Sequence, residues 1–392
     1  MKYIEKLLNG AEVKWMPLGE VCAIKTGKGV TKNDANSNGV YPIISGGKTP
    51  MDYIDIYNRQ ANTVTVSRVG ANAGFVSYIK EKFYLNDKCF SVIPNPSNSI
   101  VSRFLYYALK SQELKISALQ SEGGVPTINT TKLGNVTIPI PPFHVQEEIV
   151  RILDKFTTLE AELEAELDCR KRQYEYYRNQ LLSLDVISNK GKLNNVEVVT
   201  LGEIGTFVRG SGLQKKDFTP SGVGCIHYGQ IYTYYGTCAD KTKSFVSYET
   251  AKQLKHVEHG DVIITNTSEN VEDVCKAVVY LGKEPIVTGG HASIFKPSEK
   301  IDGKYFAYYT QTEWFARDKR KYAKGTKVID VSATDLAKIK IPIPPLAEQQ
   351  RIVSILDKFE ALTTSISEGL PKEIALRRKQ YEYYRNQLLS FA

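Results

Sequence analysis

The stretch QYEYYRNQLLS occupies residues 173–183 and occurs again, unchanged, at residues 380–390. Eleven identical residues, three of them tyrosines, do not recur by chance in a chain of 392 residues. In both copies the aromatic and leucine residues have the spacing of an amphipathic helix. The chain therefore contains the same helical segment twice, and its fold depends on what surrounds each copy.

The repeat extends well upstream of the tyrosines. IPIPPFHVQEEIVRILDKF at 138–156 resembles IPIPPLAEQQRIVSILDKF at 341–359, and the second copy has four more residues before its tyrosine segment. A weaker similarity joins PLGEVCAIKTGKG (17–29) to TLGEIGTFVRGSG (200–212), whereas the stretches in between diverge. The sequence thus predicts two variable domains, each followed by a constant helix, at a period far above the ~20–50 residues of a solenoid repeat.

The constant parts have the pattern of long coiled-coil helices. Apolar residues recur at steps of three and four from Ile149 to Leu163, and a second stripe, which includes Ile366, begins at Ile352. GLP at 369–371 interrupts this second stripe, so we expect a kink or a break there. A lone amphipathic helix of this length needs a partner, and the other copy is the best one available. The alternative is that each stripe packs on its own domain.

The variable parts read as mixed α/β domains with glycine-rich loops. NTVTVSRV (62–69) and GDVIITNT (260–267) are predicted strands. SRFLYYALKS (102–111) and KYFAYYTQTEWF (304–315) are predicted short helices. Two such domains and two long helices predict an α+β fold.

The repeat layout, with IPIPP…ILDKF twice behind two dissimilar domains, resembles the specificity (S) subunit of type I restriction-modification systems over the whole chain. The resemblance implies two mixed α/β target-recognition domains, separated by two long antiparallel helices that form a coiled coil, in a pseudo-two-fold internal duplication. The implied parts are an N-terminal segment (1–15), target-recognition domain 1 (16–143), a central constant-region helix (144–190), target-recognition domain 2 (191–346) and a C-terminal constant-region helix (347–392).

The resemblance also implies a function. Each target-recognition domain would read one half of a split site in double-stranded DNA, and because the two domains differ, the site should be bipartite and asymmetric. The helices would dock two modification (methyltransferase) subunits, and restriction (endonuclease/translocase) subunits would join the complex. The alternative, from another class, is a coiled-coil scaffold that joins two protein-interaction domains and binds no nucleic acid.

Composition and motifs favour recognition over catalysis. The formal net charge of +8 suits a polyanionic partner. The N-terminus lacks the apolar core of a signal peptide, and no stretch reaches the ~18 apolar residues of a membrane span, so we expect a cytoplasmic protein. The six cysteines are scattered singly, and the two histidines of KHVEHGD (255–261) lack a third ligand, so no metal is expected. IISGGKT (43–49) lacks the first glycine of a P-loop, so we expect neither a cofactor nor catalytic residues.

The candidate DNA-binding residues are loop cations and amides. Phosphates favour Lys and Arg, and base edges favour Arg, Lys, Asn and Gln. For each candidate the alternative is an ordinary solvated loop residue, and the tyrosines between 228 and 235 either stack on a duplex or face the core. The candidates are Lys25, Lys28, Lys48, Arg68 and Asn72 in the first domain, and Arg209, Lys215, Lys216, Gln230, Asn266, His291, Lys324 and Lys327 in the second.

The repeated tyrosine segment is the predicted partner-binding surface. The spacing of the stripe places Tyr177 and Tyr384 on the helix seam, with Arg178 and Arg385 beside it. An identical segment in both copies suggests that the same partner surface docks twice, once on each helix.

Overall fold

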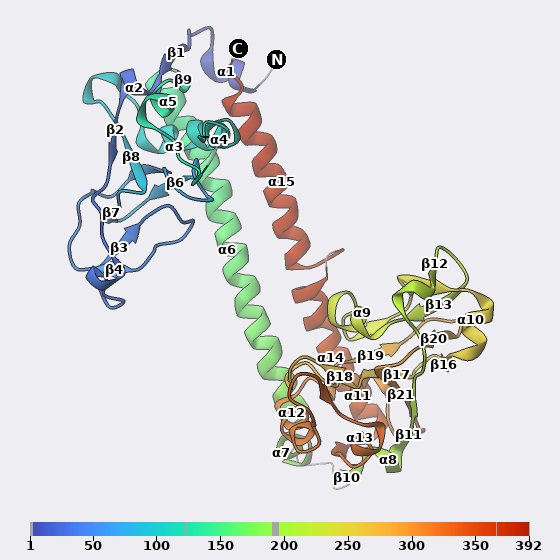
Figure 1. The fold of residues 1–392 in the computed structure, drawn as a ribbon. Helices are drawn as coiled ribbons and strands as arrows, with labels where there is room; N and C mark the ends of the chain where they lie inside the picture. Colours follow the sequence, from blue (N-terminus) through green and yellow to red (C-terminus); the bar gives the residue numbers. More distant parts are fainter. Residues whose placement is uncertain (1–2, 122–123, 190–195, 366, 392) are drawn as a thin grey trace. The chain divides into compact units, whose positions relative to one another are not determined.

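The computed structural model describes residues 3–121, 124–189, 196–365 and 367–391. The chain divides into two compact units (Figure 1): unit 1 comprises Met1–Glu164 with Glu373–Ala392, and unit 2 comprises Ala165–Lys372. Each unit thus contains one variable domain and parts of both helical regions. The predicted boundary at 190–191 and the stripe residue Ile366 lie outside the described residues.

The main sheet of unit 1 is antiparallel, in the order β2-β8-β5-β6, and a smaller sheet has the order β4-β3-β7. The strand predicted from NTVTVSRV is β5, in which Val64 and Val66 belong to the domain core while Thr65 points to the opposite face. All three are buried, so both faces of the sheet are covered. The strands are β2 (Cys22–Thr26), β3 (Tyr41–Ile44), β4 (Tyr53–Ile54), β5 (Thr63–Ser67), β6 (Val76–Ile79), β7 (Tyr84–Leu85) and β8 (Cys89–Pro94).

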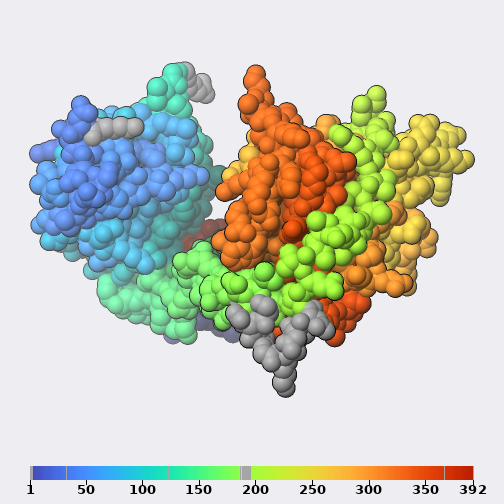
Figure 2. All heavy atoms as spheres, turned by 90° about the horizontal axis from the view of Figure 1, so that it is seen from below, coloured from blue at the N-terminus to red at the C-terminus, as the bar shows by residue number. Residues whose placement is uncertain are grey.

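One helix covers the apolar face of this sheet. It is α3 (Ser102–Ser111), which has the predicted bounds and packs against β5 and β6. Its apolar residues, including Leu105 and Leu109, recur four apart and are buried. In the space-filling view, blue residues from the N-terminal part of the chain form much of the visible face of unit 1 (Figure 2). The other elements are α1 (Tyr3–Leu8), β1 (Lys14–Pro17), α2 (Leu18–Val21), α4 (Glu113–Ser117), α5 (Thr130–Gly134), β9 (Thr137–Ile140) and the 3₁₀ turns at Lys32–Asp34 and Pro96–Asn98.

Unit 2 has an equivalent main sheet, in the order β11-β21-β17-β19-β14, and a larger second sheet, in the order β12-β15-β13-β20-β16. The predicted strand GDVIITNT is confirmed as β17. The strands of the two sheets are β11 (Gly205–Arg209), β12 (Phe218–Thr219), β13 (Val223–Ile226), β14 (Cys238–Ala239), β15 (Ser244–Val246), β16 (Lys255–Val257), β17 (Val262–Thr265), β19 (Ala277–Tyr280), β20 (Ile286–Thr288) and β21 (Ala292–Pro297).

The predicted helix KYFAYYTQTEWF is instead two helices, α11 (Gly303–Tyr309) and α12 (Glu313–Arg320). The division occurs because the Thr312 side chain accepts a hydrogen bond from the Phe315 amide and so caps a new helix. The remaining elements of this unit are α7 (Leu184–Asn189), β10 (Glu197–Thr200), α8 (Leu201–Ile204), a 3₁₀ turn at Lys215–Asp217, α9 (Tyr228–Thr233), α10 (Tyr248–Gln253), β18 (Thr267–Ser268), β22 (Ile329–Asp330), α13 (Ala333–Leu336) and β23 (Lys340–Ile343).

The constant parts form α6 (Phe143–Leu181), α14 (Leu346–Thr364) and α15 (Leu370–Leu389). The predicted interruption of the second copy is confirmed, because α14 ends before the GLP sequence and α15 begins within it. Gly369 has φ +82°, and a Cβ there would collide with the carbonyl oxygens of the preceding turn, so glycine permits this break.

The helical stripes pack in both of the ways considered. In unit 1, Ile149 and Leu153 of α6 are buried against Phe104 of their own domain and against Leu388 of α15. The two helices run antiparallel there, because Phe156 stacks on Tyr384 whereas Glu160 pairs with Arg378, earlier in α15. Each stripe therefore packs on its own domain and on the other copy of the helix.

In the part of the chain that the structure describes, no helix is both long enough and apolar enough to cross a membrane.

Candidate nucleic-acid interface

Loops from separate parts of the sequence meet at one end of the main sheet of unit 1. Thr26, the last residue of β2, lies opposite Phe90 of β8, and Ser67, the last residue of β5, lies opposite Cys89. The segments after Thr26 and Ser67 and before Cys89 therefore emerge together, at what we call the loop end of unit 1. Gly27 is needed here because a Cβ would collide with the Leu85 carbonyl oxygen.

Four of the five candidates in the first domain border this loop end. Lys25 and Lys28 are exposed at and after the end of β2. Arg68 follows β5 and is half-buried; its Nη1 donates to the Asp87 carbonyl at 3.2 Å. Asn72, half-buried, lies in the turn between β5 and β6. Two separate segments thus bring cations and an amide to one place.

The fifth candidate, Lys48, lies in the loop after β3. It is exposed, and its ammonium group is 5.8 Å from the centre of the Phe75 ring. Sequence reasoning missed Lys88, which is exposed and whose carbonyl accepts a hydrogen bond from the Arg68 amide. Its place in the polar turn NDK, just before a strand, was the available signal.

Arg59, near this end of the sheet, has a structural role. Its guanidinium donates to Ser91 Oγ and to the Thr26 carbonyl, both at 2.8 Å. It therefore fastens the loop after β2 to the sheet instead of pointing to a ligand.

Unit 2 has the same construction. Arg209 ends β11 opposite Ser293, and Thr265 ends β17 opposite Ala292. His291 immediately precedes β21 and is exposed. These residues define the loop end of unit 2, which corresponds strand for strand to that of unit 1.

The candidate cations of the second domain differ in whether they form an ion pair. Arg209, Lys215, Lys216 and Lys327 are exposed. Lys324 is also exposed but forms an ion pair with Asp335, with Nζ 3.0 Å from Oδ2.

Two amide candidates in this domain are occupied by the protein itself. Asn266 is buried; its Nδ2 donates to the Val331 carbonyl at 2.8 Å, and its Oδ1 accepts from Ser293 Oγ. Gln230 accepts from the His227 amide and donates to Ser244 Oγ. These contacts make both residues structural in this conformation, so we leave them out of the proposed interface, contrary to the sequence-based expectation. Their side chains form hydrogen bonds with backbone and hydroxyl groups, and the sequence alone does not reveal these contacts.

The tyrosines between 228 and 235 differ in exposure, so both alternatives that the sequence left open occur among them. The hydroxyl of Tyr232 is bonded to Thr265 Oγ1 at 2.7 Å, and Tyr235 is buried. Tyr234 is exposed, whereas Tyr228 lies half-buried between the rings of His227 and His291. The tyrosines whose hydroxyls are used within the domain are therefore Tyr232 and Tyr235.

His227 caps α9 as a neutral ring. Its Nδ1 accepts a hydrogen bond from the Gly229 amide at 3.1 Å, which requires an unprotonated nitrogen. Burial lowers the pKa of His227, and repulsion from Lys215, and from His291 when that ring is protonated, lowers it further. At neutral pH His227 therefore stays neutral and keeps the hydrogen bond from the Gly229 amide.

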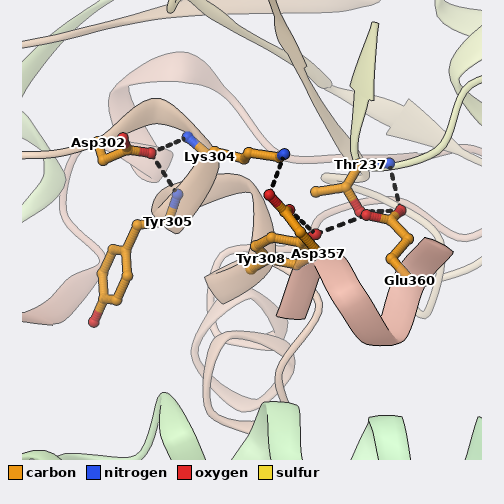
Figure 3. Close-up of polar contacts among 7 residues, drawn as sticks. All are labelled: Thr237, Asp302, Lys304, Tyr305, Tyr308, Asp357 and Glu360. Carbon is orange, nitrogen blue, oxygen red and sulfur yellow. Dashed lines mark hydrogen bonds and ion pairs between the residues drawn. The ribbon is translucent and has the colours of Figure 1, made fainter. Parts of the chain in front are cut away.

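A half-buried polar junction fixes the second domain on its helix (Figure 3). Lys304 Nζ lies 2.7 Å from Asp357 Oδ2, and the Tyr308 hydroxyl lies 2.6 Å from Asp357 Oδ1 and 2.7 Å from Glu360 Oε2. Glu360 also accepts from the amide and hydroxyl of Thr237. Burial, and then the nearby Glu360 carboxylate, raise the pKa of Tyr308 far above its usual value, so the phenol stays protonated and can donate.

Unit 1 repeats this junction with fewer groups. The Tyr107 hydroxyl donates to Asp154 Oδ1 at 2.5 Å, and Arg103 Nε lies 2.7 Å from the same oxygen. Asp154 and Asp357 are the aspartates of the two ILDKF sequences. The constant helix therefore holds one helix of each domain, α3 in unit 1 and α11 in unit 2, through the equivalent aspartate.

The predicted partner-binding residues are less free than the sequence suggests. Tyr177 stacks on Phe359 with ring centres 5.6 Å apart, and Tyr384 stacks on Phe156 at 5.2 Å. Arg178 lies over the Tyr174 ring and donates to Gln311 at 3.1 Å. Arg178, which the sequence places beside the seam, thus packs its guanidinium on a tyrosine ring, and its role in docking stays a prediction.

The second arginine is held in a similar way: Arg385 lies over the Tyr381 ring, with 5.6 Å between its guanidinium carbon and the ring centre. The most exposed tyrosines of the two repeated segments are Tyr176 and Tyr383, at 59% and 60%, whereas Tyr177 and Tyr384 are 44% and 40% exposed. Sequence spacing alone did not single them out.

Among the residues described, no group of three or more His, Cys, Asp or Glu side chains is placed to hold a metal ion. A duplicated α+β fold in which each main sheet presents cationic loops at one end defines a class of two-domain DNA-recognition proteins.

Comparisons with known proteins identify the member of this class. The family model described as the type I restriction modification DNA specificity domain matches residues 11–168 and 194–376. The EcoR124I/EcoR124II specificity subunit of Escherichia coli is 33% identical over 408 residues, which cover 100% of this chain and 97% of that protein. A putative specificity subunit of Haemophilus influenzae is 32% identical over 409 residues, covering 100% of this chain and 98% of that protein.

A solved S subunit from M. genitalium has the same fold, with a TM-score of 0.61 and 20% identity over 98% of each chain. The present chain belongs to the family of type I restriction-modification specificity subunits, which are the non-catalytic, DNA-recognising members of their complexes.

Proposed function

We propose that the two loop ends read the two halves of a bipartite, asymmetric site in double-stranded DNA. The observation that carries this proposal is the equivalence of the two loop ends. Both occur where the same strands of the main sheet finish, and both carry exposed cations, at Lys25 and Lys28 in unit 1 and at Arg209 in unit 2. The loop sequences themselves differ, so the half-sites should differ too.

The test uses the chain reconstituted with its modification subunits. A variant with Lys25, Lys28 and Arg68 changed to Ala should lose affinity and discrimination at one half-site only, as mapped by footprinting and by sequencing of methylated positions. Each lost phosphate contact should lower the slope of log K against log [salt] by about 0.9. Loss of discrimination at both half-sites together would contradict the assignment of one domain to each half-site.

A matched control removes the same charge elsewhere in unit 1. Lys6, Lys14 and Lys80 are exposed and lie outside the loop end. Their triple change to Ala should leave both half-sites intact. A coiled-coil scaffold that binds no nucleic acid would show little affinity for random duplex DNA and no salt slope, which distinguishes it from the proposed function.

We further propose that the two constant helices dock two modification subunits, with restriction subunits joining the complex in the cytoplasm. The proposed division of labour is target recognition by 16–143 and 191–346, with docking by 144–190 and 347–392. Tyr176 and Tyr383 support this, because they occupy identical positions in the two copies and are exposed.

Docking can be tested while both rings of each stack, Tyr177–Phe359 and Phe156–Tyr384, are kept. Changing Tyr176 and Tyr383 together to Ser should reduce co-purification of modification subunits, whereas changing their exposed neighbours Glu175 and Glu382 to Gln should not. Undiminished co-purification of two modification subunits with the tyrosine variant would remove this surface from the docking site.

A further inference from the structure

A groove of about 470 Å³ lies at the loop end of unit 2. Its walls combine aromatic rings, polar groups and an exposed aliphatic side chain. They include Tyr228, Tyr232, Thr267, Glu269, His291 and Val328. Glu269 was not among the residues that the sequence suggested for DNA binding, and a carboxylate beside cationic loops needs a reason, because it repels phosphates.

His291 is held in a strained conformation within this groove. Its φ is +65°, a region that residues other than glycine seldom adopt, although Gly289 and Gly290 directly precede it. Its Nδ1 lies 3.0 Å from Thr267 Oγ1, and the Tyr228 ring packs on the imidazole at 5.0 Å. In the tautomer in which Nδ1 accepts from the Thr267 hydroxyl, the ring presents Nε2–H as a donor. Backbone strain at a residue whose side chain is exposed and held in one orientation suggests a functional role.

Glu269 is a free acceptor on the same groove. Two neighbouring carboxylates are occupied: Glu272 pairs with Arg320, and Asp273 accepts from Asn270. Glu269 is exposed and forms no hydrogen bond or ion pair with any residue that the structure describes. The groove thus offers one acceptor and one donor that the protein itself does not use.

We propose that this groove reads an A·T base pair of the second half-site in the major groove. Glu269 accepts from the adenine N6 amino group, and His291 Nε2 donates to adenine N7, which is the donor–acceptor pattern that adenine presents there. Val328, which is 58% exposed, packs on the thymine methyl group of the same pair. This inference rests on the proposed DNA recognition and names one of its specificity-determining sites.

The test compares methylation motifs of the reconstituted complex. Glu269→Ala and His291→Gly should each relax the same single A·T position of the second half-site by about tenfold or more, and leave the first half-site unchanged. Glu269→Ala should also raise affinity for random duplex DNA at low salt, because it removes a negative charge that faces phosphates. Duplexes with 7-deazaadenine at that position should lose affinity for the wild type but not for His291→Gly.

Controls separate this role from general effects. Glu299→Gln removes an exposed carboxylate beyond the opposite end of β21, and Asn62→Gly relieves the same backbone strain in unit 1, where Asn62 has φ +60°. Neither should change the motif. An unchanged second half-site in both groove variants, or relaxation at two different positions, overturns the inference while a sequence-specific wild type leaves the proposed function intact. A wild-type complex without sequence specificity would instead overturn the proposed function.

Discussion

The main sheets of the two recognition domains have similar residues on one face and different residues on the other. On the shared face, Val64 of unit 1 and Val262 of unit 2 both pack in an apolar core, the first with Leu105 of α3 and the second with Phe306 of α11. The opposite faces have different chemistry. Equivalent positions carry Thr65, Ser77 and Ser91 in unit 1, and Ile263, Val278 and Ile294 in unit 2.

The difference follows from what covers each outer face. In unit 2 the five-stranded second sheet buries Ile263 and Ile294 against Ile226. In unit 1 a three-stranded sheet leaves a cavity of about 210 Å³, lined in part by Thr65 and Ser77. In each unit the face that packs on α3 or α11 keeps apolar residues, whereas the opposite face has changed together with the sheet that covers it. This is how one scaffold can carry two different recognition surfaces.

The largest expected effect comes from changing the phase of α6. Residues 158–167 read TLEAELEAEL, with EAEL twice in tandem. Two residues inserted after Leu167 rotate everything beyond them by ~200° about the helix axis, so the Phe156–Tyr384 and Tyr177–Phe359 stacks cannot both survive. We expect loss of folding or of subunit assembly, measured by size-exclusion chromatography.

An inserted EAEL unit is the matched control. It lengthens α6 by ~6 Å but turns the stripe by only ~40°. Both half-sites should be kept, with about one or two more unspecified base pairs between them, as read from methylation motifs. An unchanged spacer would show that this helix does not set the distance between the half-sites.

The second prediction concerns a buried glutamine that occurs in both units. Gln146 accepts from the Val101 amide and donates to two carbonyls, and Gln349 does the same with Asp302. Either Gln→Leu change removes the partner of three backbone groups, one of them buried, so the free energy of unfolding should fall by roughly 2–4 kcal/mol. Denaturant titration measures it. Gln350→Leu, at an exposed neighbour, should cost little; equal losses at Gln349 and Gln350 would contradict the role of burial.

The third prediction tests whether the two ring stacks are energetically equivalent. Double-mutant cycles on Phe156 with Tyr384, and on Phe359 with Tyr177, should each give a coupling of about 0.5–1.5 kcal/mol. The ring separations of 5.2 and 5.6 Å predict similar values. A coupling in one unit only would show that the duplicated helices no longer have equivalent roles.

The smallest expected effect is a dependence of the stability of unit 2 on pH. The pKa of His227 is lowered in the folded state, so the unfolded chain binds the proton first, and the stability of unit 2 should fall as pH drops below about 6.5. His227→Asn, which keeps a capping acceptor, should reduce this loss, seen as a shift of a few degrees at most in Tm between pH 7 and 5. An identical pH dependence in both proteins would assign the titration to other groups.

The sequence by itself determined the duplication, the long helices with their break at GLP, and the family, because helical periodicity and a repeated motif are local signals. It also identified β5, β17 and α3, whose patterns agree with their burial. Only the tertiary structure decided which polar side chains are free. Asn266 and Gln230 look like readers of base edges but satisfy backbone and hydroxyl groups from distant segments, and Arg178 packs on a tyrosine. Glu269, by contrast, has no partner among the described residues, whereas its neighbours Glu272 and Asp273 are paired. Hydrogen bonding depends on residues that are far apart in sequence, so no local pattern can reveal which of these groups remain for a ligand.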